Sequence, residues 1–216
     1  MKSRLDILID LLHTSPDGAL ATHSLAMPGF PFATALPFAT DECHRPVFLI
    51  SQLAEHTQNL QADSRASLLV RHLLPDGEMA RVTIVGNVRP IHAEPLQVAR
   101  YLRYQPEGER FLQLGDFRFF RLEPIQARTI GGFAQAGWLA GARLTEGVVL
   151  PLKDEAAILD ALRPQLPAGA HLLGVDSHGV DLRVAQERRR FAFADAPKAT
   201  EDIFFAAQAG VNALQS

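Results

Sequence analysis

Between Gly18 and about Phe133, short segments rich in β-branched and aromatic residues alternate with turn signals. The connectors between them, such as MPGF, TDECHRP and LPDGE, are only a few residues long. Parallel neighbours would need crossovers of a dozen or more residues, so these connectors favour antiparallel strands. Closely spaced strands of this kind are typical of an all-β barrel, and the pattern predicts one over this part of the chain.

Helical patterns flank and interrupt the barrel pattern. Leu5, Leu8, Ile9 and Leu12 follow the i, i+3, i+4, i+7 spacing of one buried stripe and predict an N-terminal helix. Two helical inserts are expected, one after Leu53 and one covering PLQVARYLRYQ and EGERFLQ.

From about Val148 the sequence reads as a helix, three strands and a closing helix, which predicts a small α+β unit. The stretch GWLAGARLTEG before it is rich in glycine and is expected to be a linker. Its Gly137-x-x-x-Gly141 spacing lacks the apolar context of a transmembrane dimer motif, so a flexible loop is predicted there.

The composition excludes several classes of protein. A hydrophobic fraction of 47% with 21% charged residues predicts a packed fold, and the net charge of −3 argues against a nucleic-acid partner. Cys43 is the single cysteine, so no intrachain disulfide can form, and a reducing cytoplasm fits best. Asp6 and Asp10 interrupt the apolar N-terminal stretch, which argues against a signal peptide, and no run approaches the ~18 apolar residues of a membrane span.

The common catalytic and metal-binding motifs are absent. The sequence contains no HExxH, GxSxG or P-loop, and no GxGxxG between a strand and a helix. The eight histidines are scattered, and no pair has metal-ligand spacing, so no metal site is predicted. No catalytic residue can be assigned from these motifs.

The stretch SQLAEHTQNL is the clearest candidate for a binding site. It places Ser51, His56 and Thr57 where an apolar strand ends and a helix begins, which would gather polar groups and free backbone N–H groups into an anion site. The alternative is that Thr57 only caps the helix and His56 lies in solvent.

Two long stretches resemble a known family. The run FPFATALPFATDECHRPVFLISQLAEHTQNLQADSRASLLV resembles the flavin-binding core of the pyridoxamine 5′-phosphate oxidase-like split barrels, in their haem-utilisation (HugZ-like) branch. The run GDFRFFRLEPIQARTIGGFAQAGWL resembles the second signature of that branch. The resemblance implies an α+β protein: an FMN-binding type antiparallel split β-barrel over residues 1–140, then a small α-β-β-β-α domain over residues 148–216.

The resemblance also implies a cofactor, FMN or haem, bound between two subunits of a homodimer. Its phosphate would be held by groups after the third barrel strand. The residues expected to contact the cofactor are Thr34, Ser51, His56, Thr57, Arg81, Asp116, Gly131 and Gly132. Relatives that bind FMN tightly have Arg and Lys at the phosphate positions, so FMN binding is expected to be weak here. The paired glycines fit either a close approach to a ligand or a tight bend.

Two further expectations rest on the resemblance. His56 of one subunit should lie close to Asp116 of the other, where the carboxylate would raise the histidine pKa. If haem binds, His171 and His178 are the best available iron ligands. Three functions stay open: an FMN-dependent oxidoreductase, a haem-binding protein that degrades haem with an external reductant, and a binding or regulatory module without a cofactor.

Overall fold

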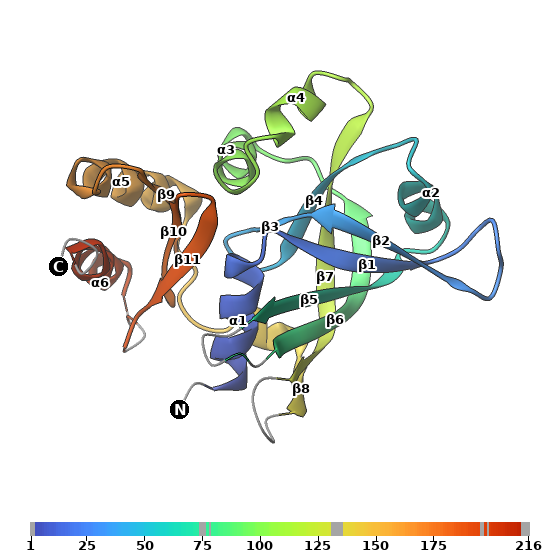
Figure 1. The fold of residues 1–216 in the computed structure, drawn as a ribbon, viewed down its shortest axis with the longest axis horizontal. Coiled ribbons are helices and arrows are strands. Elements are labelled where there is room, and N and C mark those ends of the chain that lie inside the picture. Colours follow the sequence, from blue (N-terminus) through green and yellow to red (C-terminus); the bar gives the residue numbers. More distant parts are fainter. Residues whose placement is uncertain are drawn as a thin grey trace.

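The computed structural model describes residues 3–73, 77, 79–130, 136–194, 197 and 199–212. Its main feature is a curled eight-stranded sheet, accompanied by a three-stranded sheet from the C-terminal part of the chain (Figure 1). The larger sheet contains β1 (Asp17–His23), β2 (Pro31–Pro37), β3 (Ala39–Thr40), β4 (Pro46–Ser51), β5 (Arg65–Leu73), β6 (Met79–Pro90), β7 (Phe117–Ile130) and β8 (Ala136–Ala140). Its order is β2-β1-β5-β6-β7-β4-β3, with β8 paired to β7, and every pairing is antiparallel. The predicted antiparallel barrel is therefore confirmed.

The predicted helices are also confirmed. They are α1 (Arg4–Thr14), α2 (Glu55–Ala62), α3 (Pro95–Tyr104) and α4 (Gly108–Leu112). In α1, Ser3 and Asp6 form a reciprocal capping box, which satisfies two backbone N–H groups at the start of the helix. The apolar stripe of α1 packs against the barrel core, where Leu20, Leu68 and Ile84 are completely buried. This helix thus fills the open side of the curled sheet.

The prediction of a linker after residue 136 is wrong. Residues Ala136–Ala140 form β8, and Gly141–Thr145 form a short 3-10 helix, η1. A Cβ atom on Gly141 would lie 2.1 Å from the carbonyl oxygen of Pro124, so this glycine is needed for close packing against β7. Gly141 thus serves the close packing of η1 against β7, and Gly137 lies within the strand β8.

The C-terminal unit has the predicted α-β-β-β-α order. It consists of α5 (Leu152–Leu162), the 3-10 helix η2 (Arg163–Gln165), β9 (Ala170–Val175), β10 (Gly179–Val184), β11 (Glu187–Ala192) and α6 (Thr200–Asn212). Its own apolar core includes Ile158, Leu162, Val180 and Ile203. The predicted α+β class is confirmed. Across the described residues, no helix has both the length and the apolar character needed to cross a membrane.

Candidate cofactor site

Ser51 and Asp116 meet where β4 ends and β7 begins. The Ser51 hydroxyl donates a hydrogen bond of 2.5 Å to Oδ2 of Asp116, and the Gln52 N–H donates to the Asp116 carbonyl at 2.9 Å. The Leu53 N–H donates in turn to the Ser51 hydroxyl oxygen at 3.1 Å. The Ser51 hydroxyl therefore already donates its proton to a carboxylate and cannot donate it to a ligand. A negative charge at this point disfavours a phosphate group because like charges repel.

The N-terminus of α2 carries His56 and Thr57. Ala54 is the N-cap residue and no side chain caps the helix, so the interpretation of Thr57 as a cap is wrong. Thr57 is completely buried, and neither its hydroxyl nor Nε2 of His56 has a hydrogen-bond partner among the described residues. Burial lowers the pKa of His56 in the single chain. Unsatisfied buried polar atoms are uncommon, and two of them lie together in this turn.

Thr34 and Arg81 lie on opposite faces of the sheet. Residues paired directly across antiparallel strands share a face. Thr34 pairs with Leu20, which faces the barrel core, whereas Arg81 is exposed on the other face. Arg81 also pairs with Ile130 at the end of β7, whereas Ser51 pairs with Phe117 at its start. The length of β7 therefore separates Arg81 from Ser51: a strand of 14 residues would span on the order of 45 Å if it were straight.

Among the predicted cofactor-binding residues, the single chain thus brings together Ser51 and Asp116, with His56 and Thr57 on the helix that follows β4. It does not bring Thr34 or Arg81 to the Ser51 hydroxyl. Gly131 and Gly132 lie outside the described residues. The cofactor contacts of all these residues stay predictions.

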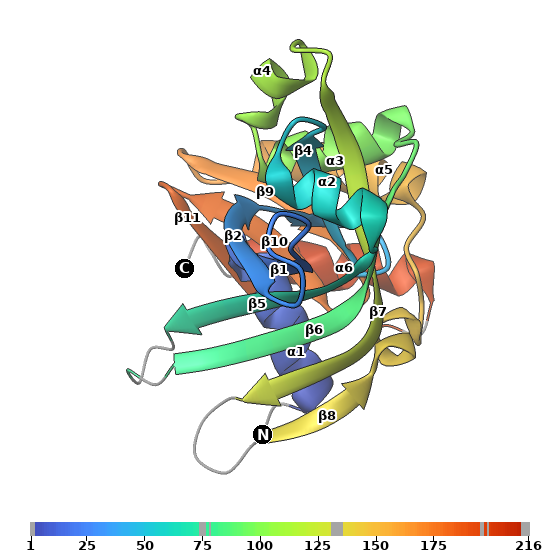
Figure 2. The ribbon, with the colours of Figure 1, turned by 90° about the vertical axis from the view of Figure 1, so that its right-hand side faces the viewer.

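The face of β1, β2, β5 and β6 that points away from the core carries small and apolar side chains in its middle, whereas Arg65, Arg71 and Arg81 lie on it nearer the strand ends. This outer face contains Ala19, Ala21, Ala33, Ala35, Ser67, Leu69, Thr83 and Val85. Figure 2 looks onto strands β5 to β8, with α1 behind them. An open hollow of about 400 Å³ on this face is lined by Ala21, Ser67, Val85 and Ile125, together with His23 and Arg65. An exposed apolar surface of this kind is typical of a face covered by a ligand or by another chain.

A second group of polar side chains is buried where α1, the β3–β4 turn and β9 to β11 meet. We call it the histidine–aspartate cluster: His13, His44, Asp176, Asp181 and Arg190. Sequence reasoning missed it, because residues 13, 44 and 176 are far apart in the chain and form no spaced motif. His178 lies beside it, with its ring centroid 5.3 Å from that of His44, whereas His171 is exposed on β9. Neither of these predicted iron ligands lies on the outer face.

The barrel matches a known family. The sequence model of the family described as "CREG, beta-barrel" matches residues 9–144. A curated relative, the chloroplastic non-canonical heme oxygenase HOZ of Arabidopsis thaliana, is 32% identical over 128 residues, which are 58% of this chain and 40% of that protein. The matched region thus spans less than half the length of this relative.

Two solved structures share the fold over nearly the whole chain. The protein Atu2129 of Agrobacterium tumefaciens is 24% identical, with a TM-score of 0.74, covering 95% of this chain and 97% of that chain. A heme binding protein from Mycobacterium smegmatis is also 24% identical, with a TM-score of 0.63 and coverage of 100% and 99%. These matches confirm the split-barrel fold that the sequence runs indicated.

Proposed function

Because the chain belongs to the CREG β-barrel family, we propose that it binds haem between the outer faces of two copies and takes part in haem degradation. The observation that supports this proposal best is the open apolar hollow of about 400 Å³ on the outer face. A flat, largely apolar macrocycle would bury these small side chains and its own surface together. The similarity to a plant heme oxygenase favours haem over other flat ligands.

The residues around the hollow are suited to the separate parts of haem. Ala21 and Val85 offer apolar walls, and Ile125 lies 59% exposed beside them. His23 also lines the hollow, and we propose it as the iron ligand in place of His171 and His178. Arg81 is exposed on the same side of the sheet and can pair with a propionate. When bound, haem supplies the redox-active iron, and the protein supplies orientation and exclusion of water.

FMN is the second candidate, favoured by the uncapped N-terminus of α2, where backbone N–H groups attract anions. The Asp116 carboxylate beside Ser51 and the complete burial of Thr57 oppose it. We therefore expect FMN to bind weakly, without the charge-assisted bonds that Arg or Lys would provide.

A homodimer forms part of the proposal, since one outer face alone would leave a bound macrocycle half exposed. We expect the two copies to bury more than ~2,000 Å² in total, as stable homodimers do. We also propose that His56 of one copy faces Asp116 of the other. That carboxylate would raise the pKa of His56, against the lowering that burial causes in the single chain. An NMR titration of His56 in the dimer, compared with Asp116→Asn, tests this contact.

The experiment that tests the function is a parallel titration of the purified protein with haem and with FMN. We expect a Soret band that saturates at one haem per chain or one haem per dimer, and loss of its ligation-dependent shift in His23→Ala. His92→Ala replaces another exposed histidine that does not line the hollow and serves as the matched control. Stoichiometric flavin that survives dialysis would favour FMN instead. Binding of neither ligand would favour a module without a cofactor.

A further inference from the structure

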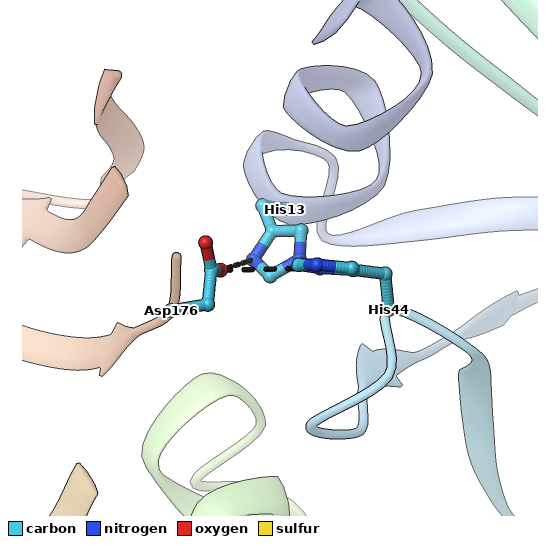
Figure 3. Close-up of side chains that lie close together, drawn as sticks. All are labelled: His13, His44 and Asp176. Atoms are coloured by element: carbon cyan, nitrogen blue, oxygen red, sulfur yellow. Dashed lines mark hydrogen bonds and ion pairs between the residues drawn. The ribbon is translucent and has the colours of Figure 1, made fainter. Parts of the chain in front are cut away.

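We propose that His13, His44 and Asp176 form a binding site for a divalent transition metal of the zinc type, which fastens the barrel to the C-terminal unit. The three side chains come from the end of α1, the β3–β4 turn and the β9–β10 turn, and they point toward one another (Figure 3). One ligand atom from each lies within 4.8 Å of the others. Two imidazoles and a carboxylate are a common ligand set for zinc and related metals.

The outer partners of His13 suit a metal ligand. Nδ1 of His13 lies 2.6 Å from Oδ2 of Asp181, which accepts its hydrogen bond. That bond leaves the lone pair on Nε2, and Nε2 faces Nδ1 of His44 at 2.9 Å. A carboxylate that holds the far nitrogen of a ligating histidine is a regular feature of metal sites, because it fixes both the tautomer and the ring orientation.

Asp176 offers an unused oxygen to the same point. Arg190 donates to Oδ1 of Asp176 and to Oδ1 of Asp181, both at 2.6 Å. Oδ2 of Asp176 is buried and has no hydrogen-bond partner among the described residues, and it lies 3.9 Å from Nδ1 of His44. A buried carboxylate oxygen without a partner is costly, and a cation would satisfy it.

The charge of the cluster also favours a cation. Asp176 and Asp181 carry two negative charges against one on Arg190, so these three side chains keep a net negative charge. The backbone of His44 has a φ of 59°, which is uncommon outside glycine.

The geometry requires only a small movement. With bonds of about 2.0–2.1 Å to each nitrogen, a tetrahedral metal would hold Nε2 of His13 and Nδ1 of His44 roughly 3.3 Å apart. Their present separation is 2.9 Å, and Asp176 would have to approach. His44 would move its proton from Nδ1 to Nε2. The fourth position is left for water or for the neighbouring His178.

The test uses the full chain, free of haem and stripped with a chelator. We expect about one Zn²⁺ per chain in competition with a chromogenic chelator, a higher melting temperature, and the intense visible absorption of four-coordinate Co²⁺. In histidine NMR spectra, Zn²⁺ should shift the His13 and His44 signals. His44→Asn, in which asparagine tolerates the positive φ, and Asp176→Asn should each weaken Zn²⁺ binding by about 100-fold or more.

His171→Asn is the matched control, since His171 belongs to the same small sheet but is exposed. It should bind Zn²⁺ like the unmodified chain. Equal affinity in His44→Asn, Asp176→Asn and the control would overturn the proposal. If the variants do not fold, the unmodified chain still decides: a weak octahedral Co²⁺ spectrum, or Zn²⁺ shifts confined to exposed histidines, would overturn it as well.

Discussion

The outer face and the histidine–aspartate cluster differ in both polarity and exposure to water. The outer face is open and exposes apolar side chains in its middle, where Leu69 is 38% and Ile125 is 59% exposed. The cluster is polar and closed, with His13 and Asp181 each at 1%. The first leaves apolar surface in water, and the second removes charges from water. Each arrangement is costly unless another group completes it.

The difference indicates what completes each region. The hydrophobic effect is non-directional, so a macrocycle or a second copy of the chain can cover the apolar surface. Buried charges require partners at fixed distances, and Arg190 supplies the positive charge that contacts both carboxylates within the chain. The cluster should therefore control the stability of one chain, whereas the outer face should control association and ligand binding.

The largest effect is expected when the cluster loses its cation. Arg190→Met would leave Asp176 and Asp181 buried without their positive partner, and we expect a loss of about 3–5 kcal/mol in the free energy of unfolding. Arg189→Met is the matched control on the same strand, because Arg189 pairs with Glu187 in solvent. It should change stability by less than about 0.5 kcal/mol. Equal effects in chemical denaturation would contradict a structural role of the cluster.

A charge introduced on the outer face should weaken the dimer but leave the stability of the single chain nearly unchanged. Val85→Lys places an ammonium group in the middle of the proposed interface, and we expect the dimer dissociation constant to rise about 100-fold, or about 2.8 kcal/mol. The stability of the single chain should change little, since Val85 is half-exposed there. Analytical ultracentrifugation measures the change. Gln186→Lys in the exposed β10–β11 turn is the control, and an unaffected dimer in Val85→Lys would place the interface elsewhere.

The barrel and the histidine–aspartate cluster also differ in how well the sequence predicts them. The barrel was predictable because strand alternation and short connectors are local signals, and the helices carry local stripes and caps. Ser51 was identified from the strand-to-helix pattern and Asp116 through the resemblance, but their mutual hydrogen bond depends on the pairing of β4 with β7. The cluster could not be found, because it requires the C-terminal unit to pack against α1. Gly141 was misread because close packing and flexibility select the same residue.

Acid should weaken the cluster before it affects the outer face. The folded-state pKa of His44 is about 3, below the unfolded value of ~6.5, so below pH ~6.5 the unfolded chain takes up a proton that the folded chain does not. In metal-free protein, stability should therefore fall by about 2 kcal/mol from this group between pH 6 and 4.5. His44→Asn should flatten this part of the curve, and the exposed control His92→Asn should not. The aspartates of the cluster, whose pKa values are lowered, add their own loss only nearer pH ~4.

The smallest expected effect on stability distinguishes a buried hydroxyl without a hydrogen bond from one that forms a hydrogen bond. Thr57 and Thr22 are both buried, but the Thr22 hydroxyl accepts a hydrogen bond of 3.0 Å from Asn59, while that of Thr57 has no partner among the described residues. Replacing Thr22 with valine keeps the shape but leaves the Asn59 amide unsatisfied, so we expect a loss of about 1 kcal/mol.

Thr57→Val removes only an unsatisfied group, so the single chain should become more stable by up to about 1 kcal/mol. If a second copy or a cofactor supplies the missing partner, the same substitution should weaken dimer or ligand affinity several-fold while it stabilises the monomer. Denaturation and ligand titration of the same variant distinguish these cases. A loss of monomer stability equal to that of Thr22→Val would show that the Thr57 hydroxyl already has a hydrogen-bond partner within one chain. The N-terminus of α2 would then need no second copy or cofactor to satisfy it.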